Sequence, residues 1–221
     1  MTDSKYGKFL TILLVIVIIA IVALLGYLGY DYYQKYFITK DTGEFLSQFD
    51  GEVEATNQTN NIGGSAENPL NQLNEAVTGG SSTSGKTWTY KGFNVLGKIE
   101  IPKTNLKYPI LDKVTKKSIE TSVAVQYTTA GLNEPGNTLI VGHNYRNGLF
   151  FSNNKKLEIG DSIFIKDNSG RTITYKVYNK YETEPSDSDY ITRDTKGARE
   201  ISLSTCTDDS KARLVIWAKE E

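Results

Sequence analysis

The chain opens with a long, unbroken apolar run. From Phe9 to Leu25 every residue except Thr11 is apolar, and no charged residue follows before Asp31. A run that is apolar on all sides, and close to the roughly 20 residues that a bilayer core requires, predicts a membrane-spanning helix over residues 9–30. Tyrosines gather at its C-terminal end, as aromatic residues do at a membrane interface: Tyr27, Tyr30, Tyr32 and Tyr33.

The flanking charges predict the orientation of this span. Lys5 and Lys8 precede it, which places residues 1–8 in the cytoplasm and everything after residue 30 on the extracellular side of a single-pass anchor. Lys35 and Lys40 on the far side weaken that signal. A cleaved secretory signal is the alternative, but the apolar run is longer than usual for one and no clear cleavage site follows. Either interpretation sends the rest of the chain out of the cytoplasm.

The stretch over residues 31–86 is polar and rich in Asn, Gly, Ser, Thr and Gln. Its loosest parts read NQTNNIGGS and TGGSSTSG, which bury too little apolar area to offset the entropy of ordering. We predict a flexible extracytoplasmic tether here. Continuation of the membrane helix over residues 31–48, and a short helix over residues 69–77, are local alternatives.

Residues 87–221 alternate apolar and polar positions in short runs separated by turn signals. The pattern predicts a mainly β domain, either a barrel or a sandwich, with short helices over residues 115–122 and 150–157. The expected strands are Phe93–Ile101, Tyr108–Leu111, Ala124–Tyr127, Thr138–Gly142, Ser162–Lys166, Arg171–Tyr181, Glu200–Cys206 and Arg213–Lys219, with a lead-in strand over residues 88–93.

Composition narrows the candidate chemistry. The net charge of -1 argues against a nucleic-acid-binding protein, because such domains are usually strongly basic. Cys206 is the only cysteine and His143 the only histidine. This excludes an internal disulfide and a zinc site built from several Cys and His residues.

Cys206 ends the run Ile201–Cys206, where strand alternation would put Ile201 and Leu203 toward a core and the thiol on the other face. A thiolate is a strong nucleophile, and a histidine can stabilise it and later donate a proton. His143 follows an apolar run and Gly142. A hairpin after Cys206 would bring Arg213 beside it, where a guanidinium could stabilise an oxyanion.

Each of these residues also has an ordinary structural explanation. Cys206 could be an inert packed thiol, His143 incidental, and Arg213 an ion-pair partner of Asp208 or Asp209. Their joint placement at strand ends of an extracytoplasmic β domain favours an active site.

Three motifs resemble the sortase family. Ser202-Leu-Ser-Thr-Cys206 resembles its Thr-Leu-x-Thr-Cys signature with Ser in the first place, Gly142-His143-Asn144 resembles its histidine strand, and Arg213–Lys219 its closing arginine strand. The resemblance spans residues 97–219. It implies a closed eight-stranded β-barrel over residues 87–221, anchored in the membrane of a Gram-positive cell through residues 9–30.

The resemblance also implies an activity. Cys206 would be the nucleophile, His143 the general acid and base, and Arg213 the stabiliser of substrate and oxyanion. Such an enzyme cleaves an LPXTG-like sorting signal between Thr and Gly, forms a thioacyl-enzyme, and passes the protein to an amine of a lipid-linked peptidoglycan precursor or of a pilin lysine. The expected signal-binding residues are Leu203, Ser204, Thr205, Asn144, Tyr190 and Ile191.

No cofactor is required for that chemistry. Some class A sortases bind calcium through loop acids, and this chain has carboxylates in comparable places, although we favour a solvated acidic loop: Glu134, Glu182, Glu184, Asp187 and Asp189. The class stays open. The short step from Cys206 to Arg213 and the Gly-His-Asn context are similar to class B, whereas residues 179–200 are too few for the class B helical insertion and are more like the loop of class A or D.

Two other functions would use the same residues. One is a non-catalytic membrane-tethered scaffold for surface or pilus assembly, with Cys206 inert. The other is a peptidoglycan L,D-transpeptidase. That family has small residues and Gly before its cysteine and an Arg two residues after it, whereas Thr205 and Asp208 stand at these places here.

Overall fold

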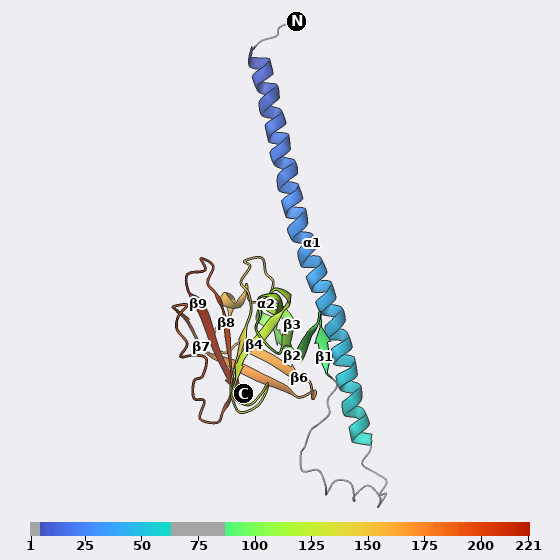
Figure 1. Cartoon of the computed structure of the whole chain (residues 1–221), viewed down its shortest axis with the longest axis vertical. Coiled ribbons are helices and arrows are strands. Elements are labelled where there is room, and N and C mark those ends of the chain that lie inside the picture. Colours follow the sequence, from blue (N-terminus) through green and yellow to red (C-terminus); the bar gives the residue numbers. More distant parts are fainter. Residues whose placement is uncertain (1–4, 63–86) are drawn as a thin grey trace, which may run out of the picture. The chain divides into compact units, whose positions relative to one another are not determined.

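The computed structural model describes residues 5–62 and 87–221 (Figure 1). Expectations for residues 63–86, which hold the looser part of the predicted tether, lie outside the described residues. The chain divides into two compact units, residues 1–43 and 44–221. Helix α1 (Lys5–Ile62) begins in the first unit and ends in the second.

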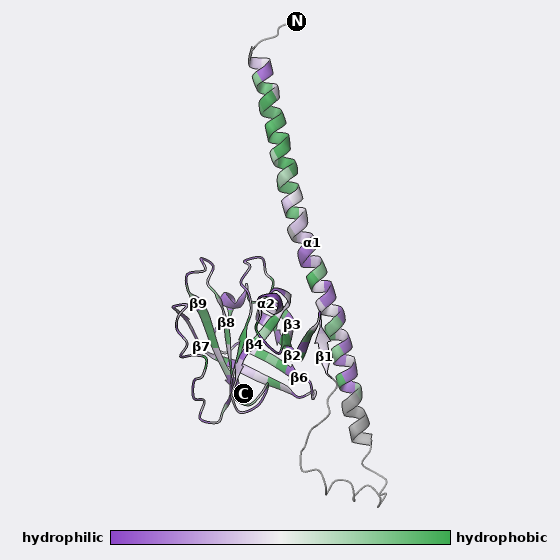
Figure 2. Cartoon of the chain, in the orientation of Figure 1, coloured by the Kyte–Doolittle hydropathy of each residue, from purple (hydrophilic) through white to green (hydrophobic). Residues whose placement is uncertain are grey.

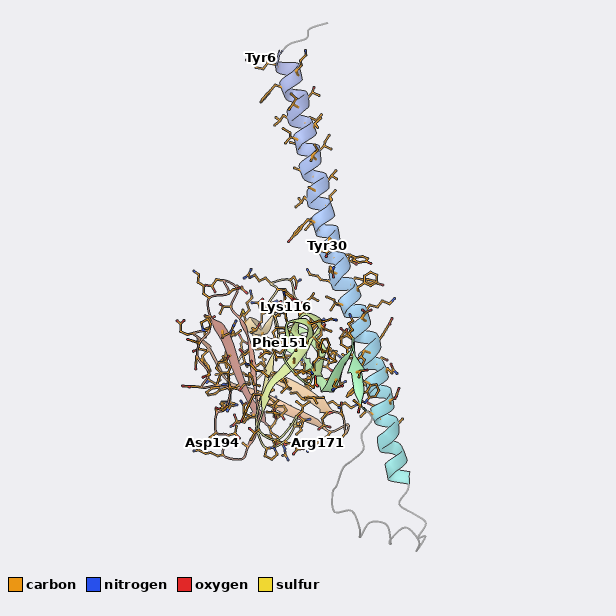
Figure 3. The ribbon with its side chains drawn as sticks, viewed as in Figure 1. Tyr6, Tyr30, Lys116, Phe151, Arg171 and Asp194 are labelled. Atoms are coloured by element: carbon orange, nitrogen blue, oxygen red, sulfur yellow. The ribbon has the colours of Figure 1, made fainter. Side chains whose placement is uncertain are left out.

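The first unit carries the apolar part of α1. Between Phe9 and Leu28 its large apolar side chains are exposed, and Figure 2 shows most of this part of the helix as hydrophobic. The side chains between Tyr6 and Tyr30 project on all sides of the helix (Figure 3). The helix is long and apolar enough to cross a membrane. A helix whose apolar side chains are exposed on all sides would be stable in the hydrocarbon core of a bilayer.

The second unit contains a closed β-barrel. Its sheet has the order β1-β2-β3-β4-β5-β8-β9-β7-β6, and an additional pairing of β2 with β6 closes the ring of eight strands from β2 to β9. The strands are β1 (Trp88–Tyr90), β2 (Phe93–Ile101), β3 (Leu106–Leu111), β4 (Val123–Thr128), β5 (Gly136–Val141), β6 (Ser162–Asp167), β7 (Thr172–Thr183), β8 (Arg199–Cys206) and β9 (Arg213–Glu220). The predicted mainly β, eight-stranded fold is confirmed.

Alternation explains why the strands form where the sequence predicts them. In β2 every second side chain from Val95 to Ile101 is buried, and the intervening ones are partly exposed. The predicted lead-in strand is also present, since β1 pairs antiparallel with β2 outside the closed ring. The ring is completed by two parallel pairings, β3 with β4 and β5 with β8.

The short helices follow the expectation only in part. Helix α2 (Lys116–Thr121) has a capping box in which the side chains of Thr115 and Ser118 each accept from the other's backbone N–H. In place of the helix expected over residues 150–157 there is a single 3-10 turn, η2 (Asn154–Lys156). Phe150 has a positive φ of 49°, which a right-handed helix cannot include. The remaining 3-10 turn is η1 (Pro102–Thr104).

The sequence predicts a flexible tether over residues 31–86. Residues 31–62 are instead helical, because α1 continues to Ile62. Phe49 and Val53, one helical turn apart, are buried in a cluster with Trp88 and Tyr90 of β1, and Phe45 packs against the same cluster. The rings of Phe49 and Trp88 lie 5.1 Å apart. Burial of this apolar stripe explains why a Gly-containing, polar segment is helical.

Candidate active site

The sheet topology brings the three candidate residues to one end of the barrel. In the parallel pair of β5 and β8, Val141 lies opposite Ser204, and two further residues along each chain are His143 and Cys206. In the antiparallel pair of β8 and β9, Cys206 lies opposite Arg213. Figure 3 marks the opposite end of the barrel with Arg171 and Asp194.

Arg213 and Cys206 are in direct contact. Nη1 of Arg213 donates a hydrogen bond to Sγ of Cys206. Both residues are partly exposed, and the thiol is free. Since a guanidinium is always protonated, it supplies a fixed positive charge and further N–H donors beside the sulfur, which is where a developing oxyanion would need them.

His143 follows the end of β5 and reaches the same site. The chain can follow this path because residue 142 is glycine. A Cβ at that position would lie only 2.9 Å from Cγ1 of Val123 and 3.0 Å from the ring of Phe151. The imidazole packs on the ring of Tyr145 at a centroid distance of 4.8 Å. Burial lowers the pKa of His143 below its ordinary value, and the charge of Glu120 partly opposes this. The histidine is therefore mainly neutral at pH 7.

A groove of about 370 Å³ contains all three residues. Of the expected signal-binding residues it is lined by Ser204, Thr205, Tyr190 and Ile191, and its remaining apolar surface comes from other elements: Val114, Ile119, Val141 and Pro185. Leu203 is 1% exposed and lies in the barrel core, where strand alternation puts it. Leu203 therefore is not available to a ligand in this groove.

Asn144 has a different environment from the one expected. Its Nδ2 donates to the backbone carbonyl of Cys206 at 3.0 Å and to Oδ1 of Asp208 at 2.9 Å. It thereby ties the histidine-bearing segment to the peptide that follows the cysteine strand. It lines a second cavity beside Cys206 and is absent from the lining of the groove.

The wall of the groove is held by a polar network that the sequence analysis missed. Asn137 is fully buried, and its Nδ2 donates to the carbonyls of Tyr190 and Ile191. Its Oδ1 accepts from Nη2 of Arg193, which also forms a largely buried ion pair with Glu200. The network fixes the loop over residues 184–198, which supplies Pro185 and Ile191 to the groove. No local motif could have revealed it, because its members are far apart in sequence.

The candidate calcium ligands are dispersed. Asp187 accepts from the hydroxyl of Thr183 and from the backbone N–H of Asp189, and Glu134 is paired with Arg171. Among residues 5–62 and 87–221, no group of three or more His, Cys, Asp or Glu residues is arranged to hold a metal. Independence from cofactors stays a prediction.

A comparison with protein families finds the sortase domain over residues 99–221, more than half of the chain. Among curated proteins, sortase A of Bacillus anthracis is 30% identical over 125 residues, which are 55% of this chain and 58% of that relative. The chain thus aligns with less than two thirds of the relative's length.

Solved structures share the fold. A Clostridium perfringens sortase D5 transpeptidase is similar with a TM-score of 0.56 and 24% identity, covering 83% of this chain and 97% of that one. A pilus-related sortase C of Group B Streptococcus has a TM-score of 0.52 and 25% identity, covering 57% of this chain and 67% of that one. Neighbours of several sortase classes thus share this barrel.

Proposed function

This chain belongs to the sortase family of transpeptidases, and from that premise we propose that it is a membrane-anchored cysteine transpeptidase acting on an LPXTG-like sorting signal. The observation that carries the proposal is the contact of Arg213 with Cys206 in a groove that His143 also lines. A nucleophile, a proton-transfer group and a cationic donor are the three parts that acyl transfer from a peptide requires.

The groove suits the acyl donor. Its apolar lining, with Ile119, Tyr190 and Ile191, can take the Leu-Pro part of the signal and leave the Thr carbonyl at Cys206. The Cys206 thiol gives its proton to the neutral His143, the thiolate attacks that carbonyl carbon, and Arg213 stabilises the oxyanion. As the C–N bond breaks, His143 in its protonated form gives its proton to the leaving glycine amine. The product is a thioester on Cys206.

The apolar helix at the N-terminus supports the membrane part of the proposal. Lys5 and Lys8 before the span favour a cytoplasmic N-terminus and an extracellular barrel. The acceptor would be an amine at the cell surface, from a lipid-linked peptidoglycan precursor or from a pilin lysine. Proteins carrying the sorting signal would be the donor partners.

Intact mass spectrometry tests the proposal. The full chain in detergent is incubated with a panel of peptides containing Leu-Pro-X-Thr-Gly, beside Cys206→Ala. We expect a mass gain equal to the peptide up to its Thr, present in the unaltered chain and absent in the variant. A chain that forms no adduct, and whose Cys206 alkylates at the same rate after His143→Ala, contradicts the proposal and favours a scaffold.

A further inference from the structure

The strands that lead to the candidate histidine and cysteine, β5 and β8, are joined by a regular parallel ladder. The backbone N–H of Gly136 donates to the carbonyl of Ala198 at 2.9 Å. The N–H of Gly142 donates to the carbonyl of Ser204 at 3.3 Å, with the same offset between the two chains. Hydrogen bonds are evenly spaced along a parallel pair, with donors two residues apart on one strand. The next donor in this ladder would therefore be the backbone N–H of Asn144.

A side chain makes that next hydrogen bond. Nδ2 of Asn144 donates to the carbonyl of Cys206 at 3.0 Å, which is the carbonyl that the ladder would reach next. The backbone of Asn144 instead pairs with Phe150 in an antiparallel bridge, where the N–H of Phe151 donates to the carbonyl of His143 at 3.0 Å. The backbone has thus left β8 at His143, and the amide of Asn144 spans the gap.

The orientation of this amide is fixed by its other partners. Nδ2 of Asn144 also donates to Oδ1 of Asp208 at 2.9 Å, and its Oδ1 accepts from the backbone N–H of Arg146 at 3.0 Å. Asp208 is held in turn by Nζ of Lys155 at 2.5 Å. Turning the amide over would place its oxygen against a carbonyl and a carboxylate, neither of which can donate. Both ends of the amide are therefore used in one arrangement.

We propose that Asn144 is a positioning residue that sets the place of His143 relative to Cys206. This inference rests on the proposed function. His143 lies between two connections to β8, the backbone hydrogen bond of Gly142 before it and the side-chain hydrogen bond of Asn144 after it. Proton transfer between a thiol and an imidazole depends on their distance and alignment. Losing the second connection would let the imidazole drift away from the sulfur.

The position of Asn144 predicts which kinetic constant depends on it. The lining of the groove includes His143 and Cys206 but does not include Asn144. A residue that acts only on the placement of the proton-transfer group affects the chemical step, whereas a residue that contacts the peptide affects its binding. The role therefore predicts a change in kcat with little change in KM.

The test variant is Asn144→Ser in the full chain in detergent. A serine hydroxyl can still accept from the N–H of Arg146 and keep the turn, but its side chain is one bond too short to replace the amide nitrogen. The control is Ser210→Ala, which removes a hydrogen bond from Nη2 of Arg146 at 2.8 Å. That bond joins the same two segments without involving Cys206.

The main readout is the rate at which iodoacetamide alkylates Cys206 at neutral pH, followed by intact mass. Cys206 is the only cysteine, so the mass gain reports this thiol alone. The rate is measured for the unaltered chain, Asn144→Ser, Ser210→Ala, His143→Ala, and the double variant of Asn144→Ser with His143→Ala. The kcat and KM for a peptide from the panel are measured for the first three.

We expect Asn144→Ser to slow alkylation and to lower kcat, each by about tenfold, with KM changed by less than about twofold. Asn144→Ala should give the same result, and Ser210→Ala should match the unaltered chain. In the His143→Ala background, Asn144→Ser should slow alkylation no further, because a residue that acts through the imidazole has no effect once the imidazole is absent.

Three results overturn the positioning role. They are an unchanged alkylation rate in both Asn144 variants, a further slowing in the His143→Ala background, and a loss of activity that appears in KM alone. If His143→Ala by itself leaves the alkylation rate of Cys206 unchanged and the unaltered chain forms no adduct with the peptides, the proposed function fails and the positioning role with it.

Discussion

At the scale of single residues, the proposed role of Arg213 depends on the geometry of its guanidinium as well as on its charge. It donates to Sγ of Cys206 from the opposite position on β9. Arg213→Lys keeps the positive charge but removes the planar fork of donors. We expect kcat/KM for peptide cleavage to fall about a hundredfold, as for loss of one oxyanion donor. A loss smaller than threefold, with the circular dichroism spectrum unchanged, would show that charge alone suffices.

His143 gives a second prediction at this scale, and it concerns pH. Burial lowers its pKa and Glu120 raises it, so Glu120→Gln should lower the pKa further. His143 is the only histidine, and its ring signals in an NMR titration report this pKa without assignment. Because the unfolded chain binds the proton more readily, stability should also fall as pH drops below the ordinary value of about 6.5. A pKa that rises in Glu120→Gln would contradict this electrostatic account.

At the scale of elements, the groove wall depends on the Arg193 network. The side chains of Arg193 and Glu200 are each 11% exposed, and removing one charge would leave the other buried and unpaired. We therefore pair Arg193→Gln with Glu200→Gln. The double variant should raise the peptide KM about tenfold by loosening residues 185–191, while iodoacetamide alkylates Cys206 at an unchanged rate.

The control for that variant is Arg199→Gln with Glu220→Gln. This ion pair joins β8 to β9 and is more exposed, at 32% and 40%, and exposed pairs contribute little. We expect the peptide KM to stay unchanged. An equal rise in KM for both double variants would assign the effect to general loosening of the sheet.

The elements also show how far sequence reasoning extends. Period-two alternation is local, and Phe93–Ile101 was predicted with the bounds that β2 has. Continuation of the apolar helix over residues 31–48 is one of the sequence's alternatives, but residues 49–62 are not predicted as helix, because Gly51 and several Asn residues favour a loop and the buried stripe is apparent only with Trp88 and Tyr90 in place. Asn137 and Arg193 were missed for the same reason, since their roles depend on contacts across the barrel.

At the scale of the whole molecule, the helix that carries the long apolar run also contributes to the folded unit. Asp50 lies 2.5 Å from Nζ of Lys98 and 3.2 Å from Nζ of Lys166, both on the barrel. Phe49 is fully buried against Trp88. Residues 44–62 thus belong to the barrel unit by packing and by charge.

Phe49→Ala tests this integration. Truncating a fully buried Phe removes apolar burial and leaves a cavity, which costs about 3–5 kcal/mol of unfolding free energy. We expect that loss for the full chain in detergent, measured by urea denaturation followed through tryptophan fluorescence. Phe37→Ala is the matched control, because Phe37 lies on the same helix in the first unit and is 42% exposed, and it should change the free energy by less than about 0.5 kcal/mol. If Phe49→Ala changes the stability as little as Phe37→Ala does, residues 44–62 do not stabilise the barrel and serve only as a spacer.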